Sequence, residues 1–299
     1  MSQPVIETVG LKKSYKAVEA VRGLDLSVPR GSVYGFLGRN GAGKTTTIKM
    51  LLGMVAPDAG AASVLGYAID RRSDSLEIRR RTGFVSEDKG LYDYMTVGQM
   101  IEFTRPLFPA WRRDRESQLL RSFDLPSSRK VKQLSKGMRT KLALLLALAR
   151  GAELLVLDEP TEGLDPAAIE EVLQILVRLV ADEEVTIFFS SHQIAEVEQI
   201  ADHISIIDRG RAVVSGALDD VKENYRRINL TFDGAAPAPS FEIAGIERIR
   251  KEGRQLSLLV SRNLDEIIDQ ARTLRAQSVD VVPVTLREIF LESVRSDDQ

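Results

Sequence analysis

A glycine-rich stretch, GRNGAGKTT at residues 38–46, has the residue types that bind phosphate groups. Gly38, Gly41 and Gly43 let backbone N–H groups turn toward phosphate oxygens, and the start of a following helix adds a partial positive charge. The stretch fits the spacing G-x-x-x-x-G-K-T, with an apolar, strand-like segment before it and a helical pattern after it. In such a loop Lys44 contacts the β- and γ-phosphates, and the hydroxyl of Thr45 coordinates Mg²⁺.

Two acidic residues at the end of another apolar segment could complete a phosphoryl-transfer site. LLVLDE at residues 154–159 predicts a buried strand that brings Asp158 and Glu159 to the carboxyl edge of a parallel sheet. There Asp158 could hold Mg²⁺, and Glu159 could polarise a water molecule directed at the γ-phosphate. SSH at 190–192 ends a further predicted strand, so His192 should emerge at the same edge and hydrogen-bond to the γ-phosphate or the water. His203 is interpreted as structural.

An apolar helix is predicted within QLSKGMRTKLALLLALAR, residues 133–150. Ser135 stands at the N-cap position, and a helix start can bind an anion. Taken alone, this stretch is better explained by an ordinary capped core helix than by an anion site. Its buried face is predicted from apolar residues at helical spacing, namely Met138, Leu142, Leu145, Leu146 and Ala149.

The segments around these motifs predict an α/β fold. Residues 5–37 are β-rich and residues 88–150 are mainly helical, whereas 153–159 and 185–191 are apolar strands with a helix between them. This strand–helix–strand order implies a parallel sheet. We predict a nucleotide-binding domain over residues 1–222, with a helical subdomain at about 88–150, and a small C-terminal accessory α+β domain over residues 223–299.

The composition limits the possible partners. With 41 Lys and Arg against 43 Asp and Glu, the net charge of −2 gives no basic field, and no nucleic acid partner is expected. Cysteine is absent, which excludes disulfides and thiolate chemistry. The N-terminus lacks a signal pattern, and the longest apolar run, at 142–149, is far shorter than the ~20 residues of a membrane span. We therefore expect that the chain does not cross a bilayer by itself.

The motifs occur in a fixed order: the glycine-rich loop, LSKGM at 134–138, LLVLDE, EGLD at 162–165, and SSH. This set resembles the ATP-binding cassette (ABC) family over residues 5–222. The resemblance implies a P-loop NTPase fold with a mixed sheet core, a β-rich N-terminal part and a helical subdomain. LSKGM stands where the family has its signature, usually LSGGQ. Ser135 and the Gly137 backbone would therefore contact the γ-phosphate of ATP bound by a second copy, in a head-to-tail homodimer.

The resemblance also assigns further residues. Tyr15 would stack on adenine, and Asp165 would link the two sites across the dimer. Glu87, in GFVSEDKG, stands where the family usually has a glutamine; a carboxylate can ligate Mg²⁺ but cannot donate a hydrogen bond to water. The full expected sets are Tyr15, Gly38, Asn40, Gly41, Gly43, Lys44, Thr45, Thr46, Ser135, Gly137 and Asp165 for ATP; Thr45, Asp158 and Glu87 for Mg²⁺; and Glu159 and His192 for catalysis.

Glu87, LSKGM and the tail VTLREIFLESV at 284–294 resemble the ATPase subunits of bacterial exporters. In that branch, which serves drug, antibiotic or ion efflux, the subunit pairs with a separately encoded membrane permease. The resemblance implies ATP hydrolysis at the cytoplasmic face of the cell membrane, with region 88–150 facing the permease and Trp111 in its core.

The same motifs allow one alternative function and argue against three other classes of protein. A soluble ABC ATPase without a membrane partner, for example of the cluster-assembly type, remains the alternative. A GTPase or a small-molecule kinase is not favoured, because no N-K-x-D motif is present and neither class explains LSKGM. An inactive binding module conflicts with the intact set of Lys44, Asp158, Glu159 and His192.

Overall fold

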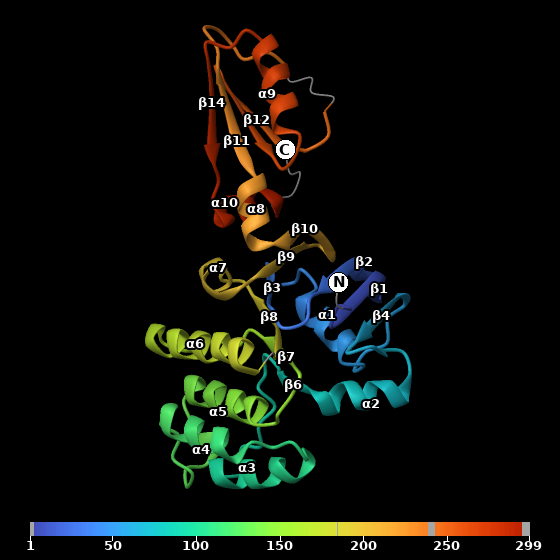
Figure 1. Cartoon of the computed structure of the whole chain (residues 1–299), viewed down its shortest axis with the longest axis vertical. Helices are drawn as coiled ribbons and strands as arrows, with labels where there is room; N and C mark the ends of the chain where they lie inside the picture. The colour runs from blue at the N-terminus through green and yellow to red at the C-terminus, as the bar shows by residue number, and fades with distance from the viewer. Residues whose placement is uncertain (1–2, 184, 239–242, 295–299) are drawn as a thin grey trace. The chain divides into compact units, whose positions relative to one another are not determined.

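The computed structural model describes residues 3–183, 185–238 and 243–294 (Figure 1). The chain divides into two compact units, the first ending at Val213 and the second beginning at Val214. The domain boundary expected after residue 222 stays a prediction. In the described parts of the chain, no helix is both long and apolar enough to span a membrane.

The first unit begins with an antiparallel sheet of strand order β2-β1-β4-β5. Strands β1 and β2 pair from Ile6 opposite Val28 to Tyr15 opposite Val18, with shifts of register between Thr8 and Ser14. Along β2, Leu24, Leu26 and Val28 are buried and alternate with more exposed residues, as expected for a sheet with one face on the core. The strands are β1 (Ile6–Tyr15), β2 (Val18–Val28), β4 (Ala59–Val64) and β5 (Tyr67–Ala68).

The central sheet of the first unit has the strand order β10-β9-β3-β8-β7-β6. The pairs β6–β7, β7–β8, β8–β3 and β3–β9 are parallel, which confirms the predicted parallel sheet. Every residue of β3, β7 and β8 is buried, so their continuous apolar sequences reflect helices or sheets on both faces. Because these three strands are neighbours, their carboxyl ends meet at one edge. The strands are β3 (Val33–Gly38), β6 (Thr82–Val85), β7 (Leu154–Asp158), β8 (Thr186–Ser191), β9 (His203–Asp208) and β10 (Arg211–Ala217).

The helices of the first unit include the predicted apolar one. In α5 the Ser135 hydroxyl accepts a hydrogen bond from the Met138 N–H at 3.2 Å, so the predicted N-cap is present. Trp111, expected in the core, is half-buried, and its indole N–H donates to Glu116 at 2.6 Å. The helices are α1 (Lys44–Leu51), α2 (Arg72–Arg81), α3 (Val97–Thr104), η1 (Arg105–Leu107), α4 (Arg113–Ser122), η2 (Val131–Gln133), α5 (Lys136–Leu148), α6 (Pro166–Glu183) and α7 (Ile194–Ile200).

The second unit is an α+β domain, as predicted. Its antiparallel sheet has the order β12-β13-β11-β14, and one face packs on α9 through a core that includes Ile228, Leu258 and Ile267. The opposite face carries polar residues. The elements are α8 (Leu218–Asn224), β11 (Arg226–Thr231), β12 (Ile246–Glu252), β13 (Gln255–Val260), α9 (Leu264–Thr273), β14 (Ser278–Pro283) and α10 (Leu286–Ser293).

Candidate active site

The glycine-rich loop connects β3 to α1 at the carboxyl edge of the parallel sheet. Gly41 and Gly43 have φ angles of 83° and 109°, which other residues rarely adopt. A Cβ atom at Gly43 would also collide with the carbonyl oxygen of Ala20. Lys44 is buried, and its Nζ donates to the carbonyl oxygen of Gly38 at 2.7 Å. The loop therefore has the backbone conformation that its sequence predicts, with the lysine held at its mouth.

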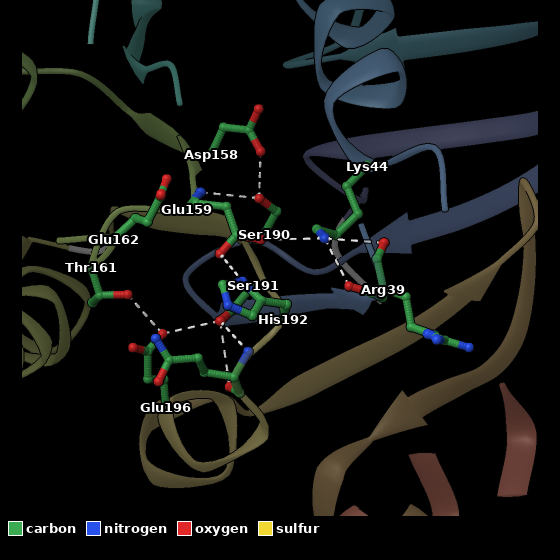
Figure 2. A network of polar contacts seen from close by, with 12 residues as sticks. Arg39, Lys44, Asp158, Glu159, Thr161, Glu162, Ser190, Ser191, His192 and Glu196 are labelled. Carbon is green, nitrogen blue, oxygen red and sulfur yellow. Dashed lines mark hydrogen bonds and ion pairs between the residues drawn. The ribbon is translucent and has the colours of Figure 1, made fainter. Parts of the chain in front are cut away.

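The two acidic residues lie at the same edge, at the end of β7, which β8 separates from β3 (Figure 2). Asp158 is buried and accepts a hydrogen bond from the Ser190 hydroxyl at 2.6 Å. Ser190 in turn accepts from the backbone N–H of Glu159 at 3.1 Å. Ser190 lies on β8, between β3 and β7, so it fixes the end of the acid-bearing strand against its neighbour. This positioning role of Ser190 was not predicted, although the residue is part of the SSH motif.

The carboxylate of Glu159 is shared between two cationic or polar partners. Its Oε2 lies 2.9 Å from His192 Nδ1, and its Oε1 lies 3.2 Å from Lys44 Nζ. Oε1 is buried and accepts no hydrogen bond within the described chain, so its contact with Lys44 is an ion pair only. A buried oxygen with spare hydrogen-bonding capacity is destabilising unless another group uses it. Lys44, Glu159 and His192 are thus brought together as predicted.

A cavity of about 490 Å³ opens at this edge. Its walls include glycines and hydroxyls of the loop together with Lys44, Glu87 and Glu159. Tyr15 is 46% exposed at the end of β1, and Val18, Ala20 and Arg22 of β2 line the cavity. Backbone N–H groups, an ammonium and hydroxyls are donors that fit a chain of phosphates. The remaining loop residues in the wall are Asn40, Gly41, Gly43, Thr45 and Thr46.

The oxygen-bearing residues of the cavity fit a hard divalent cation. Mg²⁺ is usually held by one or two carboxylates, with waters and substrate phosphates completing its coordination. Thr45 and Glu87 supply such oxygens in the cavity wall. Asp158, the third expected ligand, does not line this cavity; it lies buried at the end of β7, where it accepts from Ser190. Across the described residues, no group of three or more His, Asp or Glu side chains is arranged to hold a metal ion without other ligands. The site therefore fits Mg²⁺ bound together with phosphates.

Lys89, in the segment after β6, also reaches the acidic residues. Its Nζ donates to the carbonyl oxygen of Glu159 at 3.1 Å. Burial lowers the pKa of Lys89, while the neighbouring carboxylates of Glu162, Asp158, Glu159 and Glu87 oppose that shift. From the sequence, only Glu87 was predicted to act in this segment. A lysine in a loop gives no local signal of such a contact.

A second buried network lies beside His192. Glu196 of α7 accepts hydrogen bonds from Thr161 at 2.8 Å and from Ser191 at 3.0 Å (Figure 2). Burial raises the pKa of Glu196, and these two hydrogen bonds oppose the shift. Glu196 thus connects the segment after β7 to the segment after β8. This network was not predicted from the sequence, because Thr161 lies 35 residues before Glu196 and no local pattern indicates that the two meet.

The start of α5 lies away from the glycine-rich loop. Ser135 and Gly137 line a cavity of about 300 Å³ together with Asp165, and Lys44 lies in the wall of a different cavity. Asp165 accepts from the Ala168 N–H at 3.0 Å, and this hydrogen bond holds the pKa of Asp165 below its usual value. Lys136 forms an ion pair of 2.6 Å with Glu162. Within one chain, the structure therefore does not bring the LSKGM residues to the P-loop cavity.

Comparison with known proteins gives consistent matches. Residues 21–162 match the family model described as ABC transporter. The bacitracin transport ATP-binding protein BcrA of Bacillus licheniformis is 36% identical over 75% of this chain and 73% of its own length. The daunorubicin resistance ATP-binding protein DrrA3 of Streptomyces coeruleorubidus is 32% identical over 98% of this chain and 95% of its own length.

Solved structures agree with these relatives. The structure of an ATP binding subunit of an ABC transporter is 31% identical, with a TM-score of 0.66 over 73% of this chain and 92% of that chain. A dimeric ATP-binding cassette bound to ADP and Pi has the same TM-score over 71% of this chain and 98% of that chain. At 22% identity, this second likeness shows the fold alone.

Proposed function

The chain belongs to the ABC transporter family as an exporter-type ATP-binding subunit, and we propose that two copies hydrolyse ATP at sites shared between them. The P-loop of one copy, with Lys44 and Thr45, would bind the phosphates. The start of α5 in the second copy, at Ser135 and Gly137, would contact the γ-phosphate. This arrangement is supported by the separate cavities that the two motifs line within one chain.

Glu159 is the general base in this proposal. The observation that carries it is the contact of one buried carboxylate with both Lys44 and His192 at the carboxyl edge. The carboxylate can accept a proton from a water molecule, and His192 can hydrogen-bond to the water or the γ-phosphate. Thr45, Asp158 and Glu87 would hold Mg²⁺, which neutralises charge on the β- and γ-phosphates when bound.

An exposed aromatic cluster supports a protein partner on the helical part of the first unit. Tyr92, Tyr94 and Phe103 are 45%, 69% and 48% exposed. The ring centroid of Tyr92 lies 5.8 Å from that of Tyr94 and 5.7 Å from that of Phe103. Neighbouring large apolar side chains that remain exposed are typical of interaction sites. We propose that a segment of a separately encoded membrane permease packs on this aromatic cluster.

The relatives support export rather than a soluble role. BcrA and DrrA3 are named for bacitracin transport and for daunorubicin resistance. We propose that this chain likewise drives a permease that exports an antibiotic-like compound, and that it lies at the cytoplasmic face of the membrane through that permease. The alternative of a soluble ABC ATPase is not supported by these relatives.

A pull-down from membranes tests the proposal. Tagged Glu159→Gln protein is incubated with ATP and Mg²⁺ so that it binds ATP without turnover. It is then recovered from detergent-solubilised membranes of the native host, and its partners are identified by mass spectrometry. We expect a polytopic membrane protein in stoichiometric amount, and less of it with a Tyr94→Ala, Phe103→Ala variant.

The control for nucleotide dependence is Lys44→Ala in the same background. We expect it to lose the ATP-dependent dimer in size-exclusion chromatography. Recovery of soluble proteins alone would contradict the permease partner. A Glu159→Gln protein that stays monomeric at saturating ATP and Mg²⁺ would contradict the shared site.

A further inference from the structure

Lys89 places a cation beside the proposed general base, although no role was predicted for it within GFVSEDKG. Its side chain is half-buried, and its Nζ donates to the carbonyl oxygen of Glu159 at 3.1 Å. Lysine is rarely buried to this extent without a partner, because its ammonium is strongly hydrated. The contact spans two strands of the sheet, since Lys89 follows β6 and Glu159 follows β7.

Glu159 has a backbone conformation that requires support. Its φ angle is 49°, in the left-handed region that residues other than glycine seldom adopt. It also directly precedes Pro160, whose ring favours an extended conformation in the residue before it. Such a conformation persists only where the surrounding structure holds it.

Both backbone polar groups of Glu159 are held by side chains from neighbouring segments. The N–H donates to the Ser190 hydroxyl at 3.1 Å, and the carbonyl oxygen accepts from Lys89 Nζ at 3.1 Å and, at a longer 3.3 Å, from the Glu162 N–H. The two side-chain contacts act on opposite sides of the Glu159 Cα atom. A rotation of φ toward the extended region would therefore break at least one of them, and would also move the carboxylate away from His192 and Lys44.

We propose that Lys89 is a positioning residue for hydrolysis, which holds the Glu159 backbone in the left-handed conformation that directs its carboxylate between Lys44 and His192. The inference rests on the proposed role of Glu159 as general base. Because Lys89 lies two residues after Glu87, a displacement of this segment would release Glu159 as well.

The test compares steady-state ATP hydrolysis by the full chain and its variants. Lys89→Met removes the donor while keeping much of the side-chain volume. We expect kcat to fall about tenfold or more, because misplacing a catalytic group by about 1 Å has effects of up to ~100-fold. KM for ATP should stay near that of the unchanged protein, since the P-loop is not altered. Lys89→Arg, which keeps a charged donor, should recover a measurable part of kcat.

Asp88→Ala is the matched control, because Asp88 is exposed in the same segment and no role is assigned to its side chain. We expect its kcat to equal that of the unchanged protein. Thermal unfolding and the ATP-dependent dimer of each variant confirm that it folds. If Lys89→Met does not fold, Lys89→Ala, which also lacks a donor, replaces it, with the same expectation for kcat.

Three results would overturn the inference: an unchanged kcat in Lys89→Met, a fall in kcat matched by the same loss in Asp88→Ala, or a Lys89→Arg protein as slow as Lys89→Met. Glu159→Gln in the same assay separates the two proposals. If Glu159→Gln loses turnover and Lys89→Met does not, only the role of Lys89 is wrong. If Glu159→Gln turns over normally, the proposed function itself is wrong.

Discussion

In the first unit the charged groups lie buried at the carboxyl edge of a parallel sheet, whereas in the second unit they lie on one face of an antiparallel sheet. At the buried edge, Glu159 keeps an oxygen that no hydrogen bond satisfies within the described chain. At the open face, Glu292 of α10 is also largely buried, but it accepts from Arg250 at 2.8 Å and lies 3.5 Å from Arg248 and 3.7 Å from Arg227, all three on strands of the sheet.

The two units differ in whether their charged groups have hydrogen-bonding capacity left for a ligand. Burying a carboxylate with incomplete pairing is unfavourable, so such a group is retained where a ligand or a reaction uses it. Arginines that converge on one carboxylate mainly stabilise the surrounding fold. We therefore expect substitutions at the buried edge to affect ATP binding and turnover, and substitutions on the open face to affect stability.

The largest expected effect is that of Lys44→Ala. This substitution removes the buried ammonium of the P-loop, and with it the charge that we propose for the β- and γ-phosphates. We expect ATP binding to be lost in isothermal titration calorimetry, while Lys49→Ala, on the exposed side of α1, binds normally. Unchanged binding by Lys44→Ala would contradict the assignment of the buried edge to phosphate.

Glu159→Gln should separate ATP binding from ATP hydrolysis at the buried edge. The amide cannot act as a base, and general-base catalysis contributes about 10²–10⁴-fold to rates. We expect ATP binding to be kept and kcat to fall at least ~100-fold in a phosphate-release assay. Near-normal turnover would remove Glu159 from its proposed role.

Glu292→Ala tests the open face of the second unit. The substitution leaves three arginines without a shared carboxylate, and hydrogen bonds to charged groups contribute about 1.5–3 kcal/mol each. We expect the second unit to lose about 2 kcal/mol of unfolding free energy in urea denaturation, with ATPase kcat unchanged. Asp269→Ala is the control, because its ion pair with Arg272 is highly exposed and should contribute little. If Glu292→Ala lowered kcat without lowering the unfolding free energy, the assignment of the open face to stability would be wrong.

Glu87→Gln should have a smaller effect, although it changes a charge at the buried edge. Glutamine keeps an oxygen for Mg²⁺ and adds an N–H donor. We expect ATPase activity to be retained with an altered dependence on Mg²⁺ concentration, measured by titrating Mg²⁺ at fixed ATP. Complete loss of turnover would show that the carboxylate itself is required.

The smallest expected effect is a pH dependence of the second unit. Hydrogen bonds from the Thr285 backbone and hydroxyl, together with Arg227, hold the pKa of Glu288 below its usual value of 4.5. Because the pKa is lowered on folding, this contribution is present above about pH 4.5 and is lost as the pH falls through the folded-state pKa. Glu288 is 37% exposed, so solvent screening keeps the effect small. Glu288→Gln should make the unfolding free energy of this unit less dependent on pH between 3 and 5, measured by urea denaturation at each pH.

The elements that depend on local pattern could be predicted from the sequence. The G-x-x-x-x-G-K-T spacing fixed the loop and Lys44, because few residues other than glycine tolerate φ angles such as those of Gly41 and Gly43. The continuous apolar runs before Asp158 and His192 predicted buried parallel strands, since only a sheet covered on both faces requires them. The Ser135 cap followed in the same way from the residues next to it.

Which distant residues meet depends on the strand order and on packing, and no local pattern predicted it. The strand order put β8 between β3 and β7, and this order brings Ser190 against Asp158. The left-handed conformation of Glu159 and its contact with Lys89 have no local signal, because a proline context predicts an extended residue and a loop lysine predicts exposure. Such contacts arise from packing between segments far apart in the chain, and their free energy outweighs the local preferences that a sequence pattern records.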